Sequence, residues 1–282
     1  MQASPHRWKR QFQMTSDART AIHSIAFPPT LASNSSTSTG LKLAFISTDG
    51  HVHIYECREP QDLTHWIAID VVSVLSAPPA REVEVSFCLA FCPSRWGGEQ
   101  LVVGAMDQVR VYRHNASGKF KAAEELPGHR ALVRDVAWAV SMGRSYHLIA
   151  TACKDGHVRI FRLTAREGGK TEFPAEKVVE KEKEKTVTKR RGRVAAGLSQ
   201  GLGGDEAAAA AGDAEEVDVG VRWDVEKVAD FGDHKAEVWK VAWNATGTIL
   251  SSTGDDGKIR LWKAAIHGEF QLLSVVATPR AR

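Results

Sequence analysis

The chain has 282 residues, of which 43% are hydrophobic and 25% are charged, so it has enough apolar material to bury a core. Its formal net charge is only +3, and we therefore expect no direct binding of nucleic acid, which needs a strongly basic face. No stretch approaches the ~20 consecutive apolar residues that cross a bilayer, so we expect no membrane insertion.

The four cysteines lack the spacing of a metal site. Cys88 and Cys92, the most closely spaced pair, lie near the end of a predicted strand. We expect buried, reduced thiols here, and neither a metal nor any other cofactor. The first 14 residues lack the apolar core of a secretory signal, which favours an intracellular protein.

Short runs of alternating apolar and polar residues predict β-strands along most of the chain. In chain order, the first group has strands at 8–14, 22–27, 43–47 and 51–55, with a flexible Ser/Thr/Asn-rich loop at 33–39. The second and third groups have strands at 66–75, 88–91, 101–105, 108–112, 119–125, 133–138, 148–153 and 157–161. The last group has strands at 221–231, 238–243, 249–253, 258–262 and 270–276.

One strand–turn–strand pattern recurs in all of these groups, and its turn contains an aspartate. Three of the turns are Asp49-Gly50, Asp155-Gly156 and Asp256-Gly257. Glycine suits such a hairpin because it adopts positive φ at little cost. The copy at Asp107 is one residue shorter and lacks the glycine. Because the pattern recurs at a blade-like interval, we predict an all-β, WD40-type β-propeller with four visible blades.

Residues 164–220 show no strand periodicity and separate the third group from the last. They contain a Glu/Lys run at 176–185, a basic cluster at 189–193 and a polyalanine run at 207–211. Such a composition buries too little apolar surface to offset its ordering entropy, so we predict a disordered insertion. The basic cluster is interpreted as a solvated loop, with a localisation signal or a phosphate contact as alternatives. The expected organisation is three repeats in 1–163, the insertion in 164–220, and the last blade with a terminal outer strand in 221–282.

Two sets of residues resemble a catalytic hydroxyl–imidazole–carboxylate group, which requires all three within hydrogen-bonding reach. We instead predict buried structural hydrogen-bond networks, because the set recurs in register with the repeat whereas an active site is expected once. The fuller set is His234, Ser252, Asp256 and Trp262; the second is His129, Thr151 and Asp155, with Phe161 in the tryptophan place. The other blades keep only Asp49 and Asp107. The sequence has no nucleophile elbow, P-loop or dinucleotide fingerprint, so we expect no enzymatic activity.

The number of blades bears on how the propeller protects its edges. Four blades of this width rarely close by themselves, and open strand edges invite pairing. We therefore expect either that N-terminal repeats are missing from this chain or that a partner supplies strands by β-augmentation.

The third and last groups resemble the fifth and sixth blades of the Seh-type nucleoporins. The resemblance rests on residues 132–138, 142–147 and 150–161, and on residues 238–263. Its most specific part is the Gly-Arg-Ser-Tyr-His segment at 143–147. The related COPII-coat propeller shares the Val-Arg-Asp-Val-Ala-Trp run at 133–138 but fits that segment less well.

This resemblance implies a six-repeat open propeller that receives a further blade in trans from a helical scaffold nucleoporin. It implies a place among the subunits of the outer-ring Y-complex at the nuclear envelope, supporting transport of protein and mRNA through the pore. It also implies membership of a vacuole- or lysosome-associated coat complex that regulates TOR signalling. Relative to this family the first two blades are absent, and we expect an N-terminally incomplete chain. The alternatives are a COPII-type coat propeller and a generic WD40 adaptor that reads peptides, for which exposed arginine and aromatic residues at the channel mouth would be typical.

Overall fold

The structure is a computed structural model that describes residue 13 and residues 20–28, 41–59, 62–94, 98–115, 118–166, 222–265 and 268–277. The loop expected at 33–39, nearly all of the strand expected at 8–14 and nearly all of the insertion lie outside the described residues.

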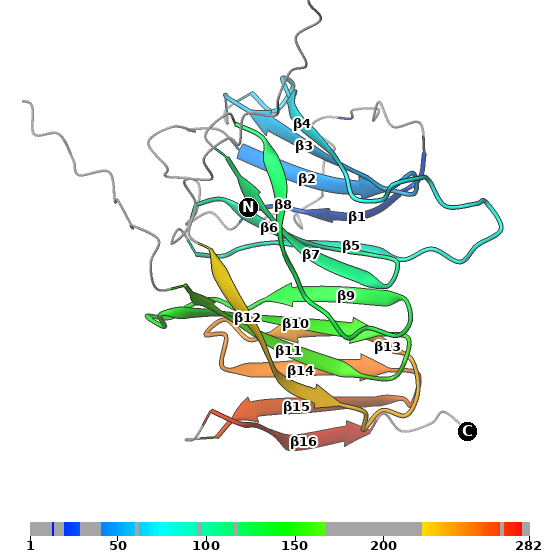
Figure 1. The fold of residues 1–282 in the computed structure, drawn as a ribbon, viewed down its shortest axis with the longest axis vertical. Helices are drawn as coiled ribbons and strands as arrows, with labels where there is room; N and C mark the ends of the chain where they lie inside the picture. Colours follow the sequence, from blue (N-terminus) through cyan, green and yellow to red (C-terminus); the bar gives the residue numbers. More distant parts are fainter. Residues whose placement is uncertain are drawn as a thin grey trace, which may run out of the picture. The chain divides into compact units, whose positions relative to one another are not determined.

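The described residues form four antiparallel sheets of four strands, each built from consecutive strands (Figure 1). The first sheet contains β1 (Ile22–Ala26), β2 (Leu41–Ser47), β3 (His51–Cys57) and β4 (Ile67–Ser73). The second contains β5 (Phe87–Phe91), β6 (Gln100–Ala105), β7 (Gln108–His114) and β8 (Phe120–Glu125). The third contains β9 (Val133–Trp138), β10 (Tyr146–Cys153), β11 (Val158–Ala165) and β12 (Trp223–Phe231). The fourth contains β13 (Val238–Trp243), β14 (Ile249–Gly254), β15 (Lys258–Ala264) and β16 (Phe270–Ala277). The predicted all-β propeller with four blades is confirmed.

The aspartate-containing turns join the two central strands of each sheet. In the three turns with glycine, φ is +79° at Gly50, +84° at Gly156 and +68° at Gly257, which is the left-handed region that glycine tolerates best. In the shorter turn of the second sheet, Met106 adopts a φ of +58° instead. The hairpin therefore keeps its shape without a glycine, at the steric cost of placing a side chain in the left-handed region.

The strands that flank the insertion are paired with each other. β11 continues to Ala165, past the boundary expected at residue 164, and β12 begins at Trp223. Ala165 is the register partner of Trp223, and the backbone N–H of Arg166 donates to the carbonyl of Arg222 at 2.9 Å. A long insertion is compatible with this blade because its two ends lie side by side and the sheet itself is uninterrupted.

The hydrophobic core lies between successive sheets, as alternating strand residues require. One cluster joins the first sheet to the second, a second joins the second to the third, and a third joins the third to the fourth. A polar contact accompanies the last of these interfaces. The Asp135 carboxylate on β9 accepts hydrogen bonds from the backbone N–H of Val241 and from Nζ of Lys240 on β13, each at 3.0 Å. A membrane-crossing helix is not found in the described part of the chain.

Candidate functional site

The fuller set of predicted network residues meets within the fourth sheet and the loop that precedes it. Nε1 of Trp262 on β15 donates to Oγ of Ser252 on β14 at 2.9 Å. The same hydroxyl lies 2.8 Å from Nε2 of His234, whose Nδ1 lies 3.0 Å from Oδ1 of Asp256 in the β14–β15 turn. The tryptophan, serine and histidine are buried, so the series of hydrogen bonds satisfies polar groups that water does not reach.

Arg260 is a member of this network that the sequence interpretation missed. Its Nη1 contacts Oδ2 of Asp256 and lies 2.8 Å from Nδ1 of His234, and its Nη2 donates to the carbonyl of Asp233 at 2.9 Å. Burial raises the pKa of Asp256, but the hydrogen bonds from Arg260 and His234 outweigh it and hold the pKa below its ordinary value. The aspartate is therefore the ionised, partly exposed partner of a buried permanent cation.

The second predicted set is only partly brought together. His129 Nε2 lies 2.9 Å from Oγ1 of Thr151, but its Nδ1 has no hydrogen-bond partner among the described residues. Asp155 is instead bound by Arg159, whose Nη2 donates to Oδ2 at 2.6 Å. Phe161 stands where the other blade has tryptophan and packs against the His129 ring, with ring centroids 5.8 Å apart. The expected direct contact between the histidine and the aspartate is not present here.

Burial and neighbouring charge fix the protonation states of this second set. Burial, aided by the positive charge of Arg159, lowers the pKa of His129 to about 4, so its ring is neutral at pH 7. Burial raises the pKa of Asp155, but hydrogen bonds, above all from Arg159, outweigh it and lower the pKa to about 2. Both arginines stand four residues after the turn aspartate, and this recurrence is the signal that could have found them.

Among the described residues of the two remaining blades, the turn aspartates make no contact with a histidine network. Asp49 Oδ1 accepts hydrogen bonds from Oγ of Ser47 and, at 3.1 Å, from the backbone N–H of His51. This is a turn-stabilising arrangement, with the carboxylate bonding its own hairpin. Asp107 lies in the shorter turn whose left-handed residue is Met106.

Neither set has the geometry of a nucleophilic site. The side chains of Ser252 and Thr151 are fully buried, so an external substrate has no route to their hydroxyls. The Ser252 oxygen is moreover committed as the acceptor for Trp262. No group of three or more histidine, cysteine or acidic side chains that could hold a metal is found among the described residues. The chemistry that this arrangement supports is structural.

The fourth sheet has one covered face and one that we call the free face. Arg260 and Trp262 on β15 point to the covered face, which packs on the third sheet. By strand alternation, Ile259 and Leu261 lie on the opposite face, and the register of β16 places Val276 opposite Ile259 on that same side. The free face is the side of the sheet that carries Ile259, Leu261 and Val276; it also carries serine and threonine side chains from β14 and β16, and its apolar residues are only partly covered.

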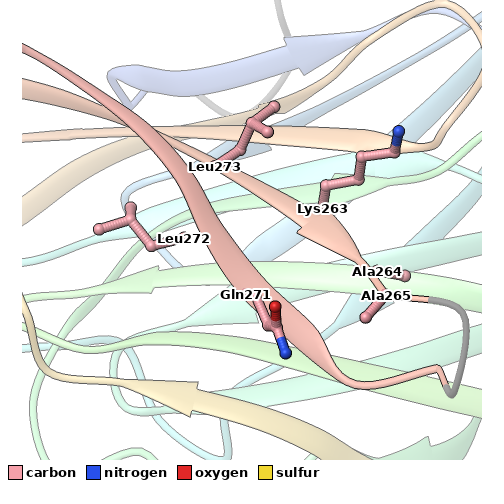
Figure 2. A pocket seen from close by; sticks show the side chains of 6 residues that line it. All are labelled: Lys263, Ala264, Ala265, Gln271, Leu272 and Leu273. Carbon is pink, nitrogen blue, oxygen red and sulfur yellow. The ribbon is translucent and has the colours of Figure 1, made fainter.

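The edge strand β16 exposes further apolar side chains, on both sides of the strand. Its exposed large apolar residues are Leu272, Leu273, Val275 and Val276. A hollow of about 400 Å³ is formed by residues of β15 and β16 and the turn after β15, as Figure 2 shows: Lys263, Ala264, Ala265, Gln271, Leu272 and Leu273. Exposed apolar surface of this kind on a sheet edge marks a site where another chain can pack or pair.

Equivalent positions of the inner strands β9 and β13 bring an arginine and an aromatic residue together. The guanidinium of Arg134 lies 4.5 Å from the ring centroid of Trp239. Trp239 is exposed, but Arg134 is nearly buried and is paired with both Glu84 and Glu237. The charge of Arg134 is therefore already neutralised. This argues against the pair as the peptide-binding surface expected of a generic adaptor.

Comparison with known proteins first shows the class of protein to which the chain belongs. The WD domain, G-beta repeat family matches residues 120–162 and 225–263, which correspond to β8–β11 and β12–β15. Each match begins on the outer strand of one sheet and ends on the third strand of the next. Together with the four four-stranded sheets, this defines a WD40-repeat β-propeller.

The relatives then identify the particular family. Nucleoporin SEH1 of Saccharomyces cerevisiae is 38% identical over 278 residues, covering 98% of this chain and 73% of the relative. Nucleoporin seh1 of Schizosaccharomyces pombe is 39% identical over 264 residues, covering 93% and 66%, and Nucleoporin SEH1 of Homo sapiens is 31% identical over 250 residues, covering 88% and 55%. The chain belongs to the SEH1 nucleoporin family and spans between about half and three quarters of the length of these relatives.

Proposed function

We propose that this protein is a non-enzymatic scaffold propeller of the nuclear pore, acting in its outer-ring Y-complex and so supporting transport of protein and mRNA. Kinship with proteins named nucleoporins supports this role over the COPII-coat alternative. The enclosed hydroxyls of Ser252 and Thr151 support a structural rather than a catalytic use of the fold.

The observation that carries the proposal is the free face of the fourth sheet. A blade of a propeller is covered on both faces by its neighbours, whereas here the residues of one face, including Ile259, Leu261 and Val276, remain partly exposed. We infer that strands of a helical scaffold nucleoporin pack on this face as an additional blade. Fully burying a valine or leucine side chain contributes about 1.5–3 kcal/mol, so a few such residues suffice for a specific contact.

Two adjacent valines of β16 provide a matched test of this docking. Val276 is 49% exposed and lies on the free face, whereas Val275 is 44% exposed and lies opposite Arg260, on the other side of the strand. Val276→Asp should weaken binding of the scaffold subunit by about 10–100-fold, because it removes apolar contact and buries an unpaired charge. Val275→Asp should leave binding nearly unchanged. Equal effects of the two substitutions, measured by titration calorimetry, would rule out docking on this face.

The assembly itself is tested by purifying the tagged endogenous protein and identifying what accompanies it. Helical pore scaffold subunits in the eluate, lost from the Val276→Asp protein alone, support the proposal. The resemblance to Seh-type nucleoporins extends it to a vacuolar, TOR-regulating coat, whose subunits would use the same face and depend on the same valine. COPII coat subunits without pore subunits would contradict the nuclear-pore role.

A further inference from the structure

A second, smaller cavity lies between the outer parts of the third and fourth sheets and has a strongly basic lining. Its volume is about 150 Å³, and its walls come from β10, β11, β15 and β16 and from the β9–β10, β13–β14 and β15–β16 connections. Its principal lining residues are Arg144, Tyr146, Leu148, Arg162, Lys263 and Phe270. Three of these are cations, and the lining contains no acidic residue. This concentration of charge stands out in a chain whose net charge is only +3.

The cations of this cavity are poorly compensated. Arg144 donates only to backbone carbonyls, from Nη1 to Gly247 at 2.9 Å and from Nη2 to Val140 at 2.6 Å. The ion-pair contact of Arg162 is with Glu226 at 3.5 Å, and that glutamate is itself largely exposed. Within the described residues, Nε of both arginines lacks a hydrogen-bond partner. Among the described residues, Arg144 and Lys263 therefore have no ion-pair partner, and Arg162 has only this long contact with an exposed glutamate.

The two guanidinium groups are also held in place before any ligand arrives. Each makes a cation–π contact with the ring of Tyr146, with Cζ of Arg144 at 5.7 Å and Cζ of Arg162 at 5.3 Å from its centroid. Gly247, with φ of +64°, lets the β13–β14 turn approach closely, since a Cβ there would lie 2.7 Å from Nη2 of Arg144. Fixing the cations in advance lowers the entropic cost of binding.

We propose that this cavity binds a phosphorylated side chain of a protein partner. A phosphoryl group carries about −1.5 to −2 charge at pH 7, which matches several convergent cations better than a single carboxylate does. Paired arginines are the residues that recognise phosphate oxygens in phosphopeptide-binding domains. The buried apolar side chains of Leu148 and Phe270 form the remaining wall, which suits an organic phosphate rather than the free ion. Arg144 and Tyr146 belong to the Gly-Arg-Ser-Tyr-His segment at 143–147, whose arginine and tyrosine thus line the cavity.

The test uses the whole protein and small probes, and it is independent of the nuclear-pore proposal because no other subunit is present. Binding of N-acetyl-phosphoserine amide, N-acetyl-glutamate amide, inorganic phosphate and an oligothymidylate is measured by titration calorimetry at constant ionic strength. The variants are Arg162→Gln, at a side chain 31% exposed, and Lys263→Gln, at an exposed residue, so that the fold tolerates them. The control is Arg58→Gln. It removes the same charge from a side chain that is 71% exposed and lies in the connection between β3 and β4 of the first sheet.

We expect capped phosphoserine to bind more tightly than the other probes, and each cavity variant to weaken that binding at least tenfold while Arg58→Gln leaves it within twofold. Equal losses in all three variants would overturn the proposal, because they would show only general charge attraction. Binding of inorganic phosphate without binding of capped phosphoserine would also overturn it, because it would show that the cavity holds an adventitious ion only. Preference for the capped glutamate or for the oligothymidylate would refute the phosphoprotein assignment in favour of acidic peptides or nucleic acid.

Discussion

The hydroxyl of Ser252 should contribute several times more to the stability of the fourth sheet than an ordinary surface hydroxyl. It accepts from Nε1 of Trp262 at 2.9 Å and lies 2.8 Å from Nε2 of His234, and all three side chains are buried. Ser252→Ala therefore leaves two buried polar groups without their partner. Each such group costs about 1–3 kcal/mol, and because the effects of neighbouring groups are not additive we expect a loss of about 2–4 kcal/mol.

The adjacent serine provides the control. Ser251 lies on the opposite face of β14, is only partly buried, and donates to the carbonyl of Ala242 at 3.0 Å. Ser251→Ala should change stability by less than about 0.5 kcal/mol, as expected of substitutions outside the core.

Urea unfolding followed by tryptophan fluorescence measures both proteins against the unaltered chain. With a urea m value of about 2 kcal/mol/M, the loss expected for Ser252→Ala lowers the unfolding midpoint by about 1–2 M. Midpoints for Ser252→Ala and Ser251→Ala that agree within error would refute the network as a stabilising element. An unchanged midpoint accompanied by a changed m value would point instead to an effect on the denatured state.

Two further substitutions test the turn and the second network. Gly247→Ala should lower the free energy of unfolding by about 1–3 kcal/mol, because its Cβ would lie 2.3 Å from the carbonyl oxygen of Val140 at a φ of +64°. Gly98→Ala is the control, because Gly98 also has a positive φ, of +81°, but no atom lies within 4 Å of its Cβ position. Equal urea midpoints for the two variants would show that the collision with Val140 does not destabilise the protein. For His129, whose folded pKa is about 4 against 6.5 for the ordinary side chain, the unfolded chain binds the extra proton, so stability should fall as the pH drops from about 6.5 towards 4. His129→Gln should flatten this part of the stability–pH profile. An unaltered slope in His129→Gln would show that the ring is not the titrating group.

The sequence indicates the fold and most of the fuller network because both depend on local rules. Period-two alternation predicts the strands, and Asp-Gly dipeptides predict the hairpins that join them. Once the hairpin at Asp256 is placed, strand register determines that Ser252 lies across from Arg260, near Trp262. Short-range geometry thus suffices to bring the predicted residues together.

Other contacts could not be predicted, because they depend on competition between partners or on contact between sheets. Asp155 was expected to bond His129, but Arg159 on the same hairpin binds the carboxylate. The role of Asp135, which joins β9 to β13, follows only from how the third and fourth sheets pack. Nor does any spacing in the sequence relate Arg162 to Lys263, which meet at one cavity from different blades.

Strand β15 connects these features, because its residues serve three different purposes. Trp262 faces inward and is fixed by Ser252, whereas Leu261 lies on the free face proposed to receive a partner blade, and Lys263 lines the basic cavity at the strand's end. A one-residue slip of register would exchange the inward and outward sets. The buried network at Trp262 therefore stabilises the sheet and also fixes which residues the strand presents to a partner. A substitution that loosens the network should consequently weaken partner binding in proportion to the population of slipped or opened sheet, even though Ser252 and Trp262 lie on the covered face.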